Sequence, residues 1–278
     1  MTNIVISSLH IYPIKSCGGI DVTQATLTPR GFEYDRQWMI VQDDDEERGM
    51  FLTQRELPEM ALIQPIVEGD TLLVRAPGMS ALRVPLAQPP DAPTMPVVVW
   101  RDTCVAVDEG TLAAQWVSDY LRAAARLVRM ADAFVRPVDP TYAKTPAQTG
   151  FSDGYPLLLI SEASLVDLNE RLIGRGKASI PMRRFRPNIV VTGCDAYAED
   201  NWSSFTIAGL SFEGVKLCAR CPITTVDPAT GSIPDVQEPL ATLATYRKAT
   251  RGVLFGQNVI HRESGTISIG DLVGNALT

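Results

Sequence analysis

Short segments in which apolar and polar side chains alternate are the feature of this chain that most constrains its fold. Turn-forming residues separate these segments, which in the first hundred residues cover 4–12, 20–28, 37–42, 71–76 and 97–100. In the first segment Val5, Leu9 and Ile11 fall on one side of an extended chain, which is the two-residue period of a half-buried strand. Several such segments bury their apolar sides by closing a sheet on itself or by packing two sheets, so we predict a β-barrel or a β-sandwich.

A helical pattern replaces this alternation after residue 111. Apolar residues recur there at spacings of three and four, from Leu112 and Trp116 through Leu127 and Val128, as on one face of an amphipathic helix. We expect this helix to separate two barrels. The next segment, residues 136–150, is rich in turn-forming residues and has no periodic pattern, so we expect a long surface loop that bridges the domains.

The second half of the chain returns to strand patterns. Strands are expected over residues 155–160, 188–192, 205–217 and 253–260. A helix is expected to begin at Ser164 and Asp167, which have the spacing of a capping box, and another to cover residues 239–247. The predicted fold class is therefore mainly β (α+β), with two β-barrel-like domains and a few flanking helices. We divide the chain into an N-terminal barrel (1–110), a connecting helix and loop (111–150) and a second barrel (151–278).

The overall charge argues against two classes of binding protein. The 25 Lys and Arg residues against 32 Asp and Glu residues give a net charge of −7, which disfavours nucleic acid or an anionic membrane as partner. The acidic run at residues 43–47 lies between predicted strands and indicates a solvated hairpin tip rather than a metal site. No segment approaches the ~20 apolar residues of a membrane span. The first residues lack the pattern of a signal peptide, so we expect the protein in the cytoplasm.

Two of the five cysteines, Cys218 and Cys221, have the spacing of zinc sites and of thiol redox pairs. A structural zinc site needs four ligands, but the other cysteines are isolated and His10 and His261 lie far away in sequence. A thioredoxin-like pair opens a helix, whereas Pro222 and the two threonines after it favour an extended chain. Two buried thiols at the end of a strand are a third possibility. The odd number of cysteines and the expected compartment disfavour a disulfide framework.

Basic and polar side chains in two further segments are candidates for binding an anion or a polar ligand. Residues 12–19 end a strand in a glycine-rich turn, where Lys15, Ser16 and backbone N–H groups could converge on an anion. Arg186 and Asn188 share one side of an extended chain and suit a polar heterocyclic ligand. Each segment also has an ordinary structural interpretation. Residues 12–19 would then be only a turn that contains a lysine, and Arg186 would be paired with a surface carboxylate.

Six segments, taken in order, carry a family resemblance. They are Tyr12-Pro13-Ile14-Lys15-Ser16, Asp35-Arg36, Arg186-Pro187-Asn188, residues 193–202, Cys218-Ala219-Arg220-Cys221 with residues 224–231, and Leu254-Phe255-Gly256-Gln257. Together they resemble the MOSC-domain proteins, above all the mitochondrial amidoxime-reducing components and their bacterial relatives. The resemblance runs from residue 4 to residue 270 and includes the N-terminal β-barrel domain of that subgroup.

The resemblance implies the molybdenum cofactor (Mo-molybdopterin), a pterin dithiolene that carries a phosphate. In the family the second cysteine of the Cys-x-x-Cys segment holds molybdenum, which implies that Cys221 is the metal ligand and catalytic residue and that Cys218 is not a ligand. Thiolate sulfur is a soft donor that suits such a metal. The other cofactor contacts of the family fall on Lys15, Ser16, Arg36, Ser152, Asp153, Gly154, Arg186, Asn188 and Arg220.

The activity that the resemblance implies is reduction of small N-hydroxylated compounds such as hydroxylamines and amidoximes. The sequence contains neither a Gly-x-Gly-x-x-Gly fingerprint nor an iron–sulfur cysteine run, so we expect a separate flavin or iron–sulfur protein as electron donor. Asp195 and Asp227 could carry protons or cap turns. Departures from the family at Ala219, at Asn258 and in the Gly154-Tyr155 loop leave substrate preference open. Two other functions also stay open: a MOSC sulfur carrier with a persulfide on Cys221, and a module that binds the cofactor for delivery without turnover.

Overall fold

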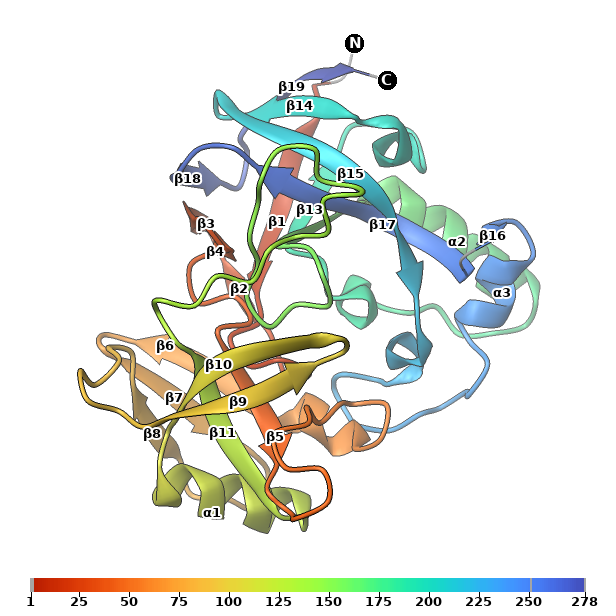
Figure 1. The fold of residues 1–278 in the computed structure, drawn as a ribbon. Helices are drawn as coiled ribbons and strands as arrows, with labels where there is room; N and C mark the ends of the chain where they lie inside the picture. The colour runs from red at the N-terminus through yellow and green to blue at the C-terminus, as the bar shows by residue number, and fades with distance from the viewer. Residues whose placement is uncertain (1–2, 251, 278) are drawn as a thin grey trace.

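The computed structural model describes residues 3–250 and 252–277, and strands dominate it (Figure 1). The strands are β1 (Val5–Ile11), β2 (Ile20–Val22), β3 (Gln24–Thr28), β4 (Gly31–Phe32), β5 (Trp38–Gln42), β6 (Gln64–Glu68), β7 (Thr71–Arg75), β8 (Leu82–Pro85), β9 (Thr94–Val99), β10 (Asp102–Asp108), β11 (Ala125–Met130), β12 (Leu157–Ser161), β13 (Ile189–Thr192), β14 (Ser204–Ile207), β15 (Leu210–Arg220), β16 (Lys248–Ala249), β17 (Gly252–His261), β18 (Gly265–Ser268) and β19 (Val273–Leu277). The α-helices are α1 (Thr111–Leu121), α2 (Glu162–Gly174) and α3 (Leu240–Ala244), and short 3-10 helices are η1 (Pro58–Leu62), η2 (Met182–Phe185), η3 (Ala198–Asn201) and η4 (Pro222–Thr225). The predicted mainly-β fold class is therefore confirmed. None of the helices within the described residues is long and apolar enough to cross a membrane.

The largest sheet joins the start of the chain to its second half. Its strands run in the order β19, β14, β15, β17, β12, β13, β1 and β2, with β16 paired to β17. In it β1 is antiparallel to β13, with Leu9 opposite Ile189, and β3 pairs with β18 in a smaller sheet that also contains β4. Side chains from these strands, among them Leu9, Phe205 and Phe212, form one buried core. The division at residues 110 and 151 stays a prediction, and the pairing places β1–β4 with the strands of the second half.

A second group of strands lies below this sheet in Figure 1, with α1 at the bottom. β5, β11, β10 and β9 form a four-stranded sheet, and β6, β7 and β8 a three-stranded one. Trp116, Val117 and Leu121 of α1 pack into a core with Trp38 of β5 and Leu127 of β11. The turn after β1 crosses from the upper to the lower group, because the Lys15 amide N–H donates to the Trp38 carbonyl at 2.8 Å.

The predicted helices exist, but their limits differ from the prediction. α1 ends at Leu121 because Arg122 takes the left-handed conformation (φ 55°), and Leu127 and Val128 belong to β11, so the expected helix was too long. α2 begins earlier than predicted, since the Ser161 hydroxyl accepts a hydrogen bond from the Ser164 amide and is the N-cap. α3 covers only Leu240–Ala244 of the expected residues 239–247.

Most predicted strands are confirmed, with two subdivisions. The segment 20–28 consists of β2 and β3. The segment 205–217 consists of β14 and the start of β15, separated by Ala208 and Gly209, which both have positive φ. The acidic run at residues 43–47 lies in the predicted turn, and residues 44–48 are exposed. The sequence patterns did not predict β4, β6, β8, β10, β11, β16, β18 or β19. Of these, β4 and β16 have only two residues each, and Leu127 and Val128 of β11 were assigned to the helix.

Arg136 fixes the two ends of the connecting loop. Its side chain is buried and donates to the Asp102 carboxylate at 2.8 Å and to the carbonyls of Gly150 and Ser152 at 2.9 and 2.5 Å. Because these bonds join β10 to residues 150–152, they hold the backbone just before the predicted cofactor-binding residues Ser152, Asp153 and Gly154.

Candidate functional site

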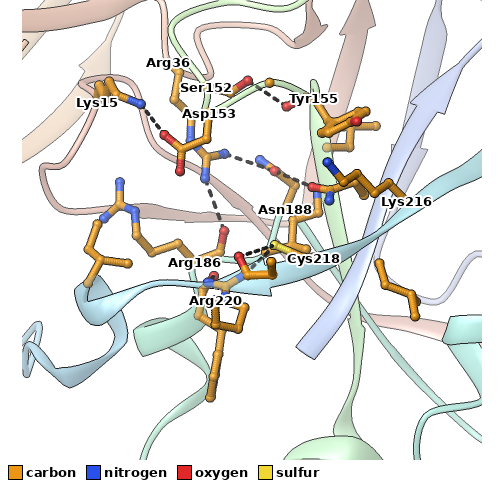
Figure 2. Close-up of a pocket in the computed structure, with 18 of the residues that line it drawn as sticks. Lys15, Arg36, Ser152, Asp153, Tyr155, Arg186, Asn188, Lys216, Cys218 and Arg220 are labelled. Carbon is orange, nitrogen blue, oxygen red and sulfur yellow. Dashed lines mark hydrogen bonds and ion pairs between the residues drawn. The ribbon is translucent and has the colours of Figure 1, made fainter. Parts of the chain in front are cut away.

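A cavity of about 270 Å³ lies where the two groups of strands meet (Figure 2). It brings together residues from the turn after β1, the loop before β12, the segment between η2 and β13, and the end of β15. The lining residues are Lys15, Ser16, Arg36, Ser152, Asp153, Gly154, Tyr155, Leu157, Leu158, Phe185, Arg186, Asn188, Lys216, Leu217, Cys218, Ala219, Arg220, Ile223 and Asn258. Every predicted cofactor-binding residue except Cys221 is among them. The role of each in binding stays a prediction.

Lys15 forms one wall of the cavity together with Asp153. Its ammonium group is buried and donates to the Asp153 carboxylate at 2.6 Å, which also accepts from the Trp100 indole N–H at 3.1 Å. Burial lowers the pKa of Lys15, and the charge of Asp153 opposes that change only in part. The Asp153 side chain is 70% exposed, so this ion pair lies at the rim, where solvent weakens it.

Two arginines enclose the ring of Tyr12 beneath the cavity. The guanidinium carbons of Arg36 and Arg186 lie 4.4 and 4.3 Å from the ring centroid, which is the distance of a cation–π contact. Burial, followed by repulsion from Arg36, lowers the pKa of Arg186 to about 10. The buried Tyr12 ring therefore holds two like charges close together. Tyr12 belongs to the first family motif, but sequence reasoning did not single it out as a site residue.

Asn188 connects Arg36 to three strands. Its side-chain oxygen accepts from Arg36 at 3.0 Å and from the Leu158 amide at 3.2 Å, and its side-chain nitrogen donates to the His10 carbonyl at 3.2 Å. Arg186 has φ 56°, so the extended geometry predicted for Arg186 and Asn188 is wrong, although both residues line the cavity. The left-handed residue directs the Arg186 guanidinium toward the Cys17 carbonyl, to which it donates at 2.6 Å.

The end of β15 lines the cavity with consecutive residues, from Lys216 to Arg220. A regular strand would present only alternate residues, but the pairing of β15 with β17 shifts register between Gly214 and Lys216 and again between Leu217 and Ala219. β-Bulges of this kind redirect side chains and occur next to active sites. Leu217 was not predicted as a site residue because a bulge leaves no mark in the alternation of a sequence, and Lys216 was not predicted because it lies just outside the family motif 218–221.

The two cysteines of the Cys-x-x-Cys segment differ in position. Cys218 lines the cavity, and its sulfur accepts from the Arg220 guanidinium at 3.0 Å. Cys221 is the residue before η4 and is not among the lining residues, so its role as metal ligand stays a prediction. Both thiols are half-buried, which contradicts the hypothesis of two buried thiols.

The segment after Cys221 is a 3-10 helix, η4, so the predicted extended chain is wrong. Thr224 and Thr225 donate their hydroxyl hydrogens to the carbonyls of Cys221 and Pro222, which stabilises the turn. In the part of the chain that the structure describes, no three His, Cys, Asp or Glu side chains meet in a group that could hold a metal ion. The zinc hypothesis therefore lacks its ligands, whereas a metal held mainly by a dithiolene needs one protein thiol.

Asp195 and Asp227, the candidate proton carriers, do not line the cavity. The Asp227 carboxylate accepts from the Ala229 amide at 2.9 Å and lies 3.5 Å from the Arg184 guanidinium. These contacts are those of a turn-capping residue, which favours the structural alternative for Asp227.

The charge and the open donors of the cavity fit an anionic, polar ligand. Among the described residues that line it, the cations are Lys15, Arg36, Arg186, Lys216 and Arg220, and the one carboxylate is Asp153. The buried atoms Arg186 Nη2 and Arg220 Nε have no hydrogen-bond partner within the described residues. Buried guanidinium donors without partners are costly, so a ligand with phosphate or heterocyclic acceptors would stabilise this arrangement. The donor set thus suits a phosphorylated pterin.

Comparison with known domains defines the class of protein. Residues 3–124 match the MOSC N-terminal beta barrel domain, and residues 146–274 match the MOSC domain. The chain is 40% identical to mitochondrial amidoxime-reducing component 1 of Mus musculus, over 96% of this chain and 81% of that protein. The human component 1 is 36% identical over 96% of this chain and 82% of that protein. A molybdenum cofactor sulfurase of Danio rerio is 32% identical over 93% of this chain but only 32% of that protein. The chain belongs to the family of MOSC-domain proteins that includes the mitochondrial amidoxime-reducing components.

Proposed function

We propose that this chain is a molybdenum-cofactor-dependent oxidoreductase that reduces N-oxygenated compounds, such as hydroxylamines and amidoximes, with electrons from a separate protein. The observation that carries the proposal is the cationic cavity at the meeting of the two groups of strands, with buried guanidinium donors left open. The names of the relatives, which match the chain nearly from end to end, supply the chemical class.

The residues of the cavity have separable tasks in this proposal. Arg36, Arg186 and Arg220 would donate to the cofactor phosphate and the polar edge of the pterin, because planar guanidinium groups suit such acceptors. Lys15 and the loop 152–154 would close the opposite wall through the Lys15–Asp153 ion pair. The Cys221 thiolate would complete the sulfur ligands of the metal.

When bound, the cofactor supplies a two-electron redox centre that can accept an oxygen atom from a substrate. The protein contributes binding, orientation and exclusion of water. Leu157, Leu158 and Phe185 form an apolar part of the cavity wall, against which a substrate can lie away from solvent. The buried ring of Tyr12 keeps Arg36 and Arg186 in place before the ligand arrives, which lowers the entropic cost of binding.

The first experiment compares the two cysteines in protein from a host that makes the cofactor. Molybdenum would be measured by mass spectrometry and the pterin by fluorescence after oxidative release. We expect near-stoichiometric molybdenum in the wild type and in Cys218→Ser, and loss of activity in Cys221→Ser because the metal loses its protein ligand. Equal molybdenum loss in both variants, or zinc in place of molybdenum, would contradict the proposal.

The second experiment tests the electron source. Purified protein would be mixed anaerobically with benzamidoxime and one donor at a time, with Cys221→Ser as the blank. We expect no reduction with NADH alone, and reduction with a flavin or iron–sulfur reductase or with a reduced viologen. Turnover with NADH alone by pure protein would remove the need for a partner. If molybdenum-loaded protein reduced no substrate with any of the donors, the result would favour the sulfur-carrier function or cofactor delivery. One relative of this chain carries the name molybdenum cofactor sulfurase, which agrees with a role in sulfur transfer.

A further inference from the structure

We infer that the cavity contains an anion-accepting subsite at Lys216, which favours N-hydroxylated substrates that also carry a carboxylate. The inference rests on the proposed function, because it concerns the substrate of the same cavity. Lys216 lies outside the predicted cofactor contacts. In Figure 2 it occupies the side of the cavity opposite Lys15 and Asp153. It is therefore a cation placed for a second ligand group.

The backbone of β15 directs Lys216 into the cavity. Lys216 pairs with Asn258 of β17 directly after the register shift that follows Gly214, and both Lys216 and Asn258 line the cavity. The bulge at Val215 thus sets the face to which Lys216 points, and the second irregularity, between Leu217 and Ala219, lets Leu217 line the cavity beside Cys218. A lysine that only faced solvent from a regular strand would not require a β-bulge at the preceding residue.

The Lys216 ammonium group has aromatic neighbours but no acidic partner. Its nitrogen lies 4.1 Å from the ring centroid of Tyr142 and 5.8 Å from that of Tyr155, and the two rings meet edge to face. Within residues 3–250 and 252–277, Lys216 forms no ion pair and no side-chain hydrogen bond. The other cations of the cavity differ, because Lys15, Arg36 and Arg220 each donate to protein acceptors.

These neighbours indicate the chemistry of the ligand. The ring of Tyr142 belongs to the connecting loop 136–150 and holds the ammonium group by a cation–π contact, which leaves its N–H donors available. Tyr155 and the apolar residues Leu157 and Leu158 offer contact area for a planar substrate body next to that charge. A charge-assisted bond from an ammonium group favours a carboxylate over a neutral group. An aryl amidoxime that carries a carboxylate satisfies both features.

The test compares benzamidoxime with 4-carboxybenzamidoxime on cofactor-loaded protein. The measured quantity is the ratio of kcat/KM for the anionic substrate to kcat/KM for the neutral one. We expect the wild type to favour the anionic substrate and Lys216→Met to lower the ratio about tenfold or more. Lys216→Arg keeps the charge and should retain most of the preference. Lys248→Met is the matched control, because Lys248 is exposed on β16 outside the cavity lining and its loss changes the net charge equally.

Calorimetric binding of 4-carboxybenzamidoxime separates failure of this inference from failure of the proposed function. If neither substrate is reduced but Lys216→Met weakens binding of the anionic compound about tenfold, the subsite holds and the reductase function falls. Equal preference of the wild type for both compounds would overturn the subsite. So would a carboxylate preference that Lys216→Met does not reduce, or a loss of thermal stability in that variant without any change in the ratio.

Discussion

Substitutions at Tyr12 should distinguish the contribution of its aromatic ring to stability from the contribution of its hydroxyl group. The ring is 3% exposed and lies between the guanidinium groups of Arg36 and Arg186. Its hydroxyl oxygen is buried without a hydrogen-bond partner among the described residues. Tyr12→Phe removes the hydroxyl alone, whereas Tyr12→Leu removes the aromatic face and leaves two positive charges near each other.

The contacts set the size of the expected effects. A cation–π contact that is shielded from water contributes roughly 1–2 kcal/mol, so losing both would reduce the free energy of unfolding by about 2–4 kcal/mol. The ring also fills the space next to Gly19, where an added Cβ would lie 2.5 Å from the ring, so the smaller leucine leaves part of that space empty. Tyr12→Phe should stay within about 1 kcal/mol of the wild type, because the hydroxyl it removes has no partner to lose.

Urea unfolding of the cofactor-free protein, followed by tryptophan fluorescence, measures both free energies. Cofactor content after expression in a competent host gives a second measure, since Tyr12→Leu should release the two arginines from their positions and lower retention. Equal destabilisation by the two variants would refute the argument from the ring. A leucine variant as stable as the wild type would show that the stack contributes nothing.

Three further predictions concern the site and its support. Arg186→Lys keeps the charge but removes the planar guanidinium group, and should weaken cofactor affinity by about 1–3 kcal/mol in a cofactor-release assay. Full retention of the cofactor would show that Arg186 has only a structural role. Arg129→Leu should lower the free energy of unfolding by about 3–5 kcal/mol in urea, because it leaves the buried Glu109 carboxylate without its ion-pair partner at 2.6 Å; a small loss would contradict this. Burial lowers the pKa of His10 below 6.5 despite its bond to Asp21, so the unfolded chain takes up the proton first and stability should fall as pH drops below that value. His10→Asn should flatten this dependence in urea titrations between about pH 5 and 8.

The sequence predicted the fold class because alternation and turn residues survive in the local pattern. β1, β5, β7 and β13 are all visible in this way. The limits of α1 were less predictable, since Leu127 and Val128 continue the helical spacing by coincidence and belong to β11. The left-handed conformation of Arg122 ends the helix, and arginine gives no sequence signal for it. The pairing of β1 with β13 is long-range and has no local signature at all.

The site residues were predicted by motif, but the pairing of strands explains why they meet. Asn188 accepts from the Leu158 amide and donates to the His10 carbonyl, so it joins β12, β13 and the end of β1 in one place. This arrangement brings the turn at Lys15 and Ser16 to a segment more than a hundred and fifty residues later in the chain. The spacing of residues within one motif carries no information about contacts between segments so far apart in sequence.

The two irregularities in the pairing of β15 with β17 decide which side chains of the Cys-x-x-Cys region face the cavity. Under strict alternation Lys216, Cys218 and Arg220 would share one side and Leu217 and Ala219 the other, yet all five line the cavity. The irregular pairing with β17 therefore adds Leu217 and Ala219 to the surface that the sequence pattern assigns to the other three residues. The extra residue of the first irregularity is Val215 of β15, whereas that of the second lies on β17. Since a shift of one residue exchanges the faces of a strand, deleting Val215 should turn Lys216 and Cys218 away from the ligand together. The same two irregularities thus position the proposed carboxylate subsite and the thiol next to Arg220, which links substrate choice and cofactor environment in one strand.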